Sequence, residues 1–171
     1  MELLKDFNIK KYLDKKPPSD NSFTTMQEVK ELNNTPINKN FVKQKDNIKK
    51  AFTKIVDEGK FIQKLIDESA PLILKIKKHH DRPRPYELDK SLKAVKMDSM
   101  DTPSYPSGHS AQGILIGMAL SDKYPSKKTK LMKIAKNISK SRNIAHAHYK
   151  SDSKFGEQIG KDMYNHIKNK L

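Results

Sequence analysis

The sequence contains no cysteine and no tryptophan. The lack of cysteine excludes disulfide bonds, thiol catalysis and metal sites with cysteine ligands. Aromatic residues do not alternate with the basic runs, which argues against a stacking surface for single-stranded nucleic acid. The longest apolar run, residues 113–120, is too short to cross a bilayer. The N-terminal segment also lacks the apolar stretch of a signal peptide, so we expect a soluble, cytoplasmic protein.

Arginine is scarce although positive charge is abundant. Lysine and arginine together number 35 against 20 acidic residues, for a net charge of +15, yet only Arg82, Arg84 and Arg142 are arginines. The lysines are spread along the chain as on a solvated surface, so a nucleic-acid partner is not favoured, and contact with an anionic membrane is the alternative. The arginines lie in two clusters that hold most of the histidines. Since arginine binds phosphate through a planar fork, these clusters are candidates for a functional site.

The pattern of apolar residues predicts helices throughout the chain. At 171 residues the chain is long enough for one domain with one core. No segment alternates as a strand would, so we predict an all-α fold, a compact single-domain helical bundle. Residues 1–22 are polar and are expected to form a poorly ordered N-terminal arm before a helical domain, residues 23–171. Helices are predicted around residues 26–32 (with Thr25 and Glu28 as a capping box), 41–55, 61–66, 71–80, 107–120, 131–145 and 155–171, and a loop over residues 86–105.

The first cluster pairs a lysine with an arginine seven residues later. Lys77 and Arg84 have this spacing, and so do Lys75 and Arg82. On a helix, seven residues make two turns and place both side chains on nearly one face, about 10 Å apart. The prolines on both sides of Arg84 end the helix and stiffen its backbone, so we predict that Lys77 and Arg84 share an anion and that Arg82 lies outside. The alternative is a basic helix end that complements its own dipole.

The second cluster opens the most apolar helix with the sequence Pro106-Ser107-Gly108-His109. Glycine lets a ligand approach the backbone closely, and the amides of a helix N-terminus attract anions. Ser107 would add a hydroxyl donor, and His109 would face the anion as a proton donor. The alternative is an ordinary capped helix start followed by a surface histidine.

The third cluster places His148 four residues before Asp152. The carboxylate can accept a hydrogen bond from one ring nitrogen and leave the other free as a nucleophile. Arg142 lies six residues before His148, so the helix must end between them if both are to reach one ligand. His80 and His146 are rival nucleophiles, but neither has a carboxylate four residues later. The alternative is a solvated helix end with an incidental ion pair.

Together the three clusters resemble the three-part signature of the type 2 phosphatidic acid phosphatase / vanadium haloperoxidase superfamily. The resemblance covers residues 77–152, and the first 40 or so residues lie outside it. The chain differs in having lysine after Tyr149 where proline is frequent, in lacking the transmembrane helices of the lipid phosphatases, and in being much shorter than the haloperoxidases. It most resembles the soluble acid phosphatases, which are usually secreted. The matching blocks are Lys77-x6-Arg84-Pro85, Pro106-Ser107-Gly108-His109 and Ser141-Arg142-x5-His148-x3-Asp152.

The resemblance implies a phosphatase that hydrolyses small-molecule phosphate monoesters without a metal or other cofactor. It implies that His148 attacks phosphorus to form a phosphohistidine, that Asp152 fixes its tautomer, and that His109 protonates the leaving alcohol and then activates water. Vanadate is expected as an inhibitor. The resemblance assigns the phosphate oxygens to Lys77, Arg84, Ser107, Gly108 and Arg142.

Three other functions fit parts of the pattern. A lipid phosphatase would act on phosphatidic acid or an isoprenoid diphosphate at a membrane surface, with the lysines as an electrostatic anchor. A haloperoxidase would hold vanadate as a cofactor in the same pocket. A phosphate- or nucleic-acid-binding module would not catalyse a reaction, and the pairing of His148 with Asp152 argues against it because binding alone does not require that pair.

Overall fold

The computed structural model describes residues 2–171, and helices account for the regular structure in that range. The prediction of an all-α fold is confirmed. No helix in this range is long and apolar enough to cross a membrane. The helices are α1 (Lys10–Leu13), α2 (Phe23–Asn33), α3 (Lys39–Asp46), α4 (Ile48–Thr53), α5 (Gly59–His80), α6 (Pro85–Leu88), α7 (Gly108–Lys123), α8 (Lys128–Ile144) and α9 (Lys150–Ile167), with short 3-10 turns η1 (Asp98–Asp101), η2 (Pro125–Lys127) and η3 (Lys168–Lys170).

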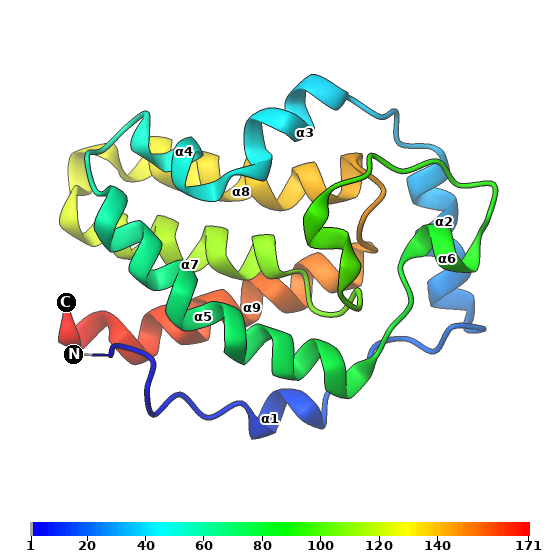
Figure 1. The fold of residues 1–171 in the computed structure, drawn as a ribbon, viewed down its shortest axis with the longest axis horizontal. Coiled ribbons are helices and arrows are strands. Elements are labelled where there is room, and N and C mark those ends of the chain that lie inside the picture. Colours follow the sequence, from blue (N-terminus) through cyan, green and yellow to red (C-terminus); the bar gives the residue numbers. More distant parts are fainter. Residues whose placement is uncertain (1) are drawn as a thin grey trace.

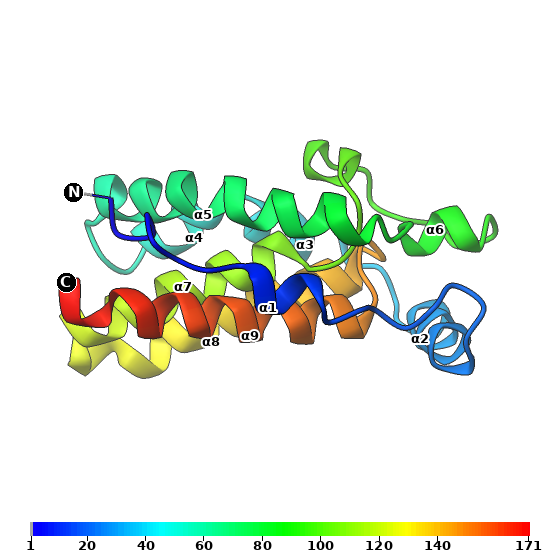
Figure 2. The same cartoon turned by 90° about the horizontal axis from the view of Figure 1, so that it is seen from below.

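The four longest helices run along the long axis of the molecule, with α7 in the middle (Figure 1). Seen from the side, α5 lies on one side of α7, and α8 and α9 lie on the other (Figure 2). Both ends of the chain lie at one end of the bundle, and α2 and α6 lie at the opposite end. The three predicted clusters fall at the α2–α6 end, where α5 finishes and where α7 and α9 begin.

Helix α7 can occupy the centre because it is apolar on nearly all sides and has small residues where other helices cross it. A Cβ atom placed on Gly117 would lie 2.9 Å from the Cβ of Ala135 in α8. On the other side, a Cβ on Gly160 of α9 would lie 2.2 Å from the carbonyl oxygen of Ala111. The backbones of α7 and α9 are therefore in direct contact. This contact brings the first turns of the two helices together.

Helix α5 is continuous although Pro71 lies inside it. The sequence predicted two segments meeting near that proline. Proline removes one backbone hydrogen bond from a helix. Buried residues on both sides of it, including Leu65 and Ile73, hold the helix against the core, so the helix extends without interruption to His80.

Two predicted helix boundaries are wrong because asparagine and serine side chains cap the helices elsewhere. The segment 41–55 is split into α3 and α4 at Asn47, whose side chain accepts a hydrogen bond from the amide of Lys50 at 2.9 Å. Helix α2 is capped by Ser22, which accepts from the amide of Thr25 at 3.1 Å, so the predicted capping box at Thr25 and Glu28 does not form. The predicted loop 86–105 contains most of α6 and the turn η1.

The N-terminal segment is ordered, and the prediction of a poorly ordered arm is wrong. Leu3, Leu4 and Tyr12 are buried in the same core as the long helices. The hydroxyl of Tyr12 donates to Asp162 of α9 at 2.6 Å, and its carbonyl accepts from the ring of His80 at 2.8 Å. Residues 2–22 thus lie against α5 and α9. Apart from the one-turn helix α1 this segment is irregular, so its apolar side chains produce no periodic signal in the sequence.

Gly160→Ala is expected to lower the free energy of unfolding by at least about 2 kcal/mol, because the new methyl group would force the backbones of α7 and α9 apart. Gly59→Ala is the matched control, since its Cβ would meet only the flexible end of Lys49, at 3.2 Å. Urea unfolding followed by circular dichroism measures both. Equal stability of the two variants would contradict direct backbone contact.

Candidate active site

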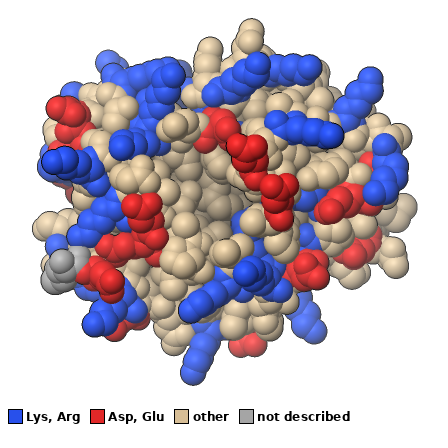
Figure 3. Space-filling model, in the orientation of Figure 1, with Lys and Arg blue, Asp and Glu red and all other residues tan. Residues whose placement is uncertain are grey.

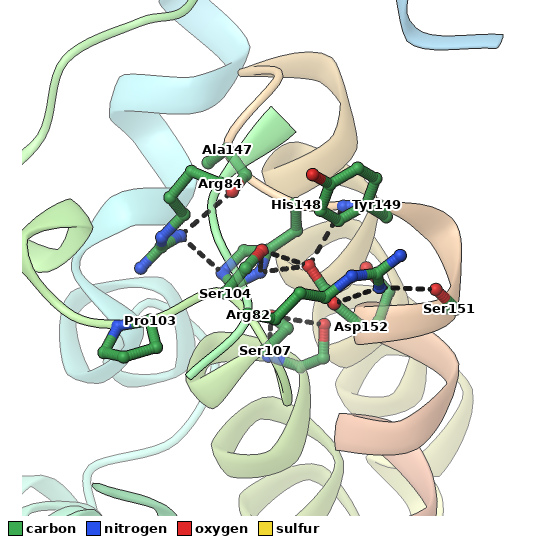
Figure 4. A network of polar contacts seen from close by, with 12 residues as sticks. Arg82, Arg84, Pro103, Ser104, Ser107, Ala147, His148, Tyr149, Ser151 and Asp152 are labelled. Carbon is green, nitrogen blue, oxygen red and sulfur yellow. Dashed lines mark hydrogen bonds and ion pairs between the residues drawn. The ribbon is translucent and has the colours of Figure 1, made fainter. Parts of the chain in front are cut away.

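His148 lies in the connection between α8 and α9, on the inside of the molecule. Helix α8 ends at Ile144, and the chain turns through His146, which has a positive φ of 58°. The helix thus ends between Arg142 and His148, as the spacing required. His148 is 4% exposed. Its ring is fixed at both nitrogens, as Figure 4 shows.

The two ring nitrogens of His148 have different partners. Nδ1 donates to Oδ2 of Asp152 at 3.0 Å, and Nε2 accepts from Nη1 of Arg84 at 3.0 Å. Burial, followed by the charges of Arg84 and Lys77, holds the pKa of His148 well below its usual range. The imidazole is therefore neutral at neutral pH, with the lone pair of Nε2 directed away from Asp152. This is the state that a nucleophilic histidine requires.

Asp152 is completely buried, and its carboxylate accepts hydrogen bonds from four groups. Besides His148, its donors are the Ser104 hydroxyl, the amide of Tyr149 at 3.1 Å and the guanidinium of Arg82 at 2.8 Å. Burial raises the pKa of Asp152 to about 6, and Arg82 opposes this rise. The carboxylate is thus mostly ionised at neutral pH. It can compensate a positive charge on the ring of His148.

Arg82 does not lie outside the site, and that prediction is wrong. It is 2% exposed, and Nη1 contacts Asp152 and the Ser151 hydroxyl, each at 2.8 Å. Its guanidinium also lies 3.8 Å from the ring centre of Tyr149. Arg82 and Arg84, one on each side of Pro83, contact different members of the pair: Arg82 contacts Asp152, and Arg84 contacts Nε2 of His148.

Two cations, Lys77 and Arg84, lie beside Nε2 of His148, the ring nitrogen that does not contact Asp152. The Lys77 ammonium is buried and donates to the carbonyl of Pro103 at 2.7 Å. Burial, with the charge of Arg84 as the second cause, lowers the pKa of Lys77 to about 7. Carbonyl oxygens fix the Arg84 guanidinium: those of Thr102 at 2.9 Å and Ala147 at 3.0 Å. The two positive groups are held close together without a carboxylate between them.

These groups open into one pocket of about 270 Å³. On the face seen in Figure 3, the middle of the molecule is hollowed and mostly uncharged, with charged side chains around it. Five of the predicted site residues line this pocket. They are Lys77 from α5, Gly108 and His109 from α7, Arg84 from the segment after α5, and His148 from the connection between α8 and α9. Its lining residues are Ala70, Ile73, Leu74, Lys77, Arg84, Ser99, Thr102, Gly108, His109, Gln112 and His148.

Ser107 and Arg142 are not among the lining residues of this pocket. Ser107 is buried, and its hydroxyl caps α7 by accepting from the amide of Ser110 at 3.3 Å, so the predicted hydroxyl donor acts as a helix cap. Its amide donates to the carbonyl of Asp152 at 3.0 Å, which ties the start of α7 to α9. The Nη1 of Arg142 contacts Asp46, and its Nη2 is buried without a hydrogen-bond partner among residues 2–171.

Asp46, the last residue of α3, is the site residue that the sequence analysis missed. Its backbone carbonyl accepts from Nε2 of His109 at 2.8 Å. Its carboxylate lies 3.5 Å from the same nitrogen and 3.3 Å from Nη1 of Arg142. The hydrogen bond from His109 is the main cause that lowers the pKa of Asp46. A lone aspartate 63 residues before its partner carries no local signal in the sequence.

The two rival histidines are occupied elsewhere. The ring of His80 donates to the Tyr12 carbonyl. Both ring nitrogens of His146 face carbonyl oxygens, those of Lys93 at 2.7 Å and Thr35 at 2.8 Å. Neither ring has a nitrogen directed into the pocket that Lys77 and Arg84 line.

Comparison with known proteins gives a partial match. No family model matches the chain. A non-specific acid phosphatase from Salmonella typhimurium is 33% identical over 87 residues, which cover 49% of this chain and 35% of that protein. The chain thus spans about a third of the length of this curated relative.

Arg82→Ala is expected to lower the free energy of unfolding at pH 7 by about 3 kcal/mol or more, because it leaves the buried Asp152 carboxylate without its ion pair. The loss should shrink towards pH 5, where Asp152 takes up a proton in the variant and no longer needs a cation. Urea unfolding at both pH values measures this difference.

Lys75→Ala, on the exposed side of α5, is the control and is expected to change stability by less than about 0.5 kcal/mol. Similar stability losses in Arg82→Ala and Lys75→Ala would contradict a structural role for the Arg82–Asp152 pair.

Proposed function

We propose that the protein is a metal-independent phosphatase that hydrolyses phosphate monoesters through a phosphohistidine at His148. The observation that carries the proposal is the environment of the ring: Nδ1 is anchored on a buried carboxylate, while Nε2 opens into a pocket with two cations. The partial similarity to a non-specific acid phosphatase supports the same reaction class. A vanadate ion, which adopts the trigonal-bipyramidal geometry of the transition state, is expected to inhibit more strongly than phosphate.

In the first step, Nε2 of His148 attacks phosphorus and the bond from phosphorus to the ester oxygen breaks. His109 gives its proton to that oxygen, so that an alcohol leaves. The imidazole becomes a cation, and the Asp152 carboxylate at Nδ1 compensates the new charge. Arg84 contacts Nε2 in the empty site, so its guanidinium must transfer that hydrogen bond to a phosphate oxygen when substrate binds.

In the second step, water attacks the phosphohistidine. His109, which has lost its proton in the first step, takes one proton from the water molecule. The bond between phosphorus and Nε2 then breaks, the ring returns to its neutral form, and inorganic phosphate leaves. His109 is then protonated again, as it was before the first step, so the starting enzyme is restored. Every proton and bond is accounted for by His148, His109 and water.

Charge stabilisation in this scheme comes from side chains and backbone amides. Phosphoryl transfer depends mainly on positioning and on compensation of negative charge. In this scheme Lys77, Arg84 and the amide of Gly108 hold the equatorial oxygens, and the support is that all three residues line one pocket with His148. Arg142 does not line the pocket, but its positive charge is near enough to lower the pKa of both His148 and His109, so in this scheme it adds to the compensation of negative charge.

His148→Ala is expected to abolish turnover and leave the circular dichroism spectrum unchanged. Acid quenching of the wild-type enzyme with ³²P-labelled substrate should trap label on His148, and EDTA should have no effect. His166→Ala, at a half-buried position on α9 that does not line the pocket, is the control and should keep full activity. Loss of wild-type activity in EDTA that a divalent ion restores would overturn the mechanism.

The pH dependence of kcat/KM should follow His109, which must be protonated to act as the acid. Burial lowers the pKa of His109 from its ordinary value, so activity should be highest on the acidic side of neutrality and fall as pH rises. The Asp46 carboxylate raises that pKa. Asp46→Asn should therefore lower it further and move the alkaline limb to lower pH.

Asp101→Asn is the control for this shift, because it makes the same change in charge at an exposed residue beside the pocket that does not contact His109. An alkaline limb that stays in place in Asp46→Asn, or one that moves equally in both variants, would contradict His109 as the acid.

A further inference from the structure

The pocket has a second half that the proposed chemistry does not use. Its catalytic half is defined by Lys77, Arg84, Gly108, His109 and His148. Ser99 and Thr102 belong to the same half, because both hold the guanidinium of Arg84. The remaining lining residues are Ala70, Ile73, Leu74 and Gln112.

The unused half is a trough that leads away from the phosphate site between α5 and α7. Ala70, Ile73 and Leu74 precede Lys77 by seven, four and three residues, so all four residues lie on one face of α5. Two helical turns separate Ala70 from Lys77, which corresponds to about 10 Å. On the other wall, Gln112 lies one turn beyond Gly108 on α7. Both walls therefore run outward from the phosphate site.

The trough carries no charged side chain among its lining residues. The amide nitrogen of Gln112 donates to the Ile66 carbonyl at 3.3 Å and to the Ser69 hydroxyl at 3.1 Å. Both of its N–H groups are thus committed to α5 and cannot serve a ligand. The other three residues are aliphatic. A leaving group in this trough meets mainly apolar surface, in contrast to the cations at the catalytic half.

The volume limits the size of the group that fits. The whole pocket, phosphate site included, has a volume of about 270 Å³. Pockets that enclose drug-sized ligands are larger, roughly 300–1,000 Å³. A phosphate group together with one ring or a short alkyl chain is the appropriate size.

Resting on the phosphatase function proposed above, we propose that the trough formed by Ala70, Ile73, Leu74 and Gln112 binds the leaving group, and that the enzyme selects phosphate monoesters of small, uncharged, apolar alcohols. Polyols and charged leaving groups would lose water in the trough and find few hydrogen-bond partners, because the N–H groups of Gln112 are committed and the other three residues are aliphatic, which disfavours their binding. Burial of the apolar leaving group provides the preference.

The test uses phosphonates, which have a carbon–phosphorus bond and bind without being hydrolysed. n-Butylphosphonate and 3,4-dihydroxybutylphosphonate have the same chain length and differ only in two hydroxyl groups. Calorimetric titration of the wild-type protein is expected to show about tenfold tighter binding of n-butylphosphonate. Equal binding, tighter binding of the diol, or no binding of either compound would overturn the proposal.

Leu74→Asn should reduce the ratio of the two dissociation constants to near one, since it places a polar amide in the trough. Leu72→Asn is the matched control on the same helix, because Leu72 does not line the pocket, and it should keep the wild-type ratio. Ala70→Asn, at an exposed position that tolerates a polar residue, should change the ratio in the same direction as Leu74→Asn. An unchanged ratio in both trough variants would contradict the assignment.

The same pair of leaving groups then separates this proposal from the phosphatase function. The corresponding esters, n-propyl phosphate and glycerol 3-phosphate, have equal chain lengths and should show the same preference in kcat/KM. If the phosphonates bind with the expected ratio and neither ester is hydrolysed, the trough assignment stands and the phosphatase proposal fails. If both esters are hydrolysed at equal rates and the phosphonates bind equally, the phosphatase proposal stands and the trough assignment fails.

Discussion

The buried carboxylate of Asp152 is the group on which the geometry of the site depends. An ionised carboxylate away from water is costly unless charge and hydrogen bonds compensate it. Arg82, Ser104 and the amide of Tyr149 provide this compensation, from the end of α5, the segment before α7 and the start of α9. The anion thereby joins three distant parts of the chain. The ring of His148 takes its orientation from the same carboxylate, so stability and nucleophile placement rest on one group.

The close contact of α7 with α9 places the two halves of the site relative to each other. Gly156 lies so near the carbonyl of Ser107 that a Cβ atom there would be 2.3 Å from it. The amide of Ser107 bonds to the carbonyl of Asp152 at the same crossing. The start of α7, with the Gly108 amide, and the start of α9, which carries Asp152, are thus held as one unit. An added methyl group at either glycine of α9 would separate the anion-binding amide from the nucleophile.

Sequence patterns predicted the helices and the residue pairs that depend only on spacing along the chain. The apolar run of α7, the i, i+4 apolar residues of α9 and the spacing of His148 from Asp152 all follow from helical periodicity. Arg82 is held by Asp152, Ser151 and Glu28, which come from distant parts of the chain, so the local lysine–arginine spacing does not predict its burial. The burial of Leu3 and Leu4 requires the finished helices against which they pack. Asp46 meets His109 only because α3 lies against the helices that follow it, so its role is a property of the fold.

The closely spaced positive charges of the pocket link anion binding to proton uptake. Lys77 and Arg84 are held side by side by backbone carbonyls, and the pKa of Lys77 is lowered to about 7. A phosphate anion placed between them favours the protonated lysine and must raise that pKa. Anion binding raises the proton affinity of the lysine, and protonation of the lysine raises the affinity for the anion by the same factor. The pocket is therefore expected to bind the anion less tightly as pH rises above 7. In the proposed mechanism the lysine therefore acts together with His109, since each requires its proton when substrate is bound, and both would make the site most effective at acidic pH.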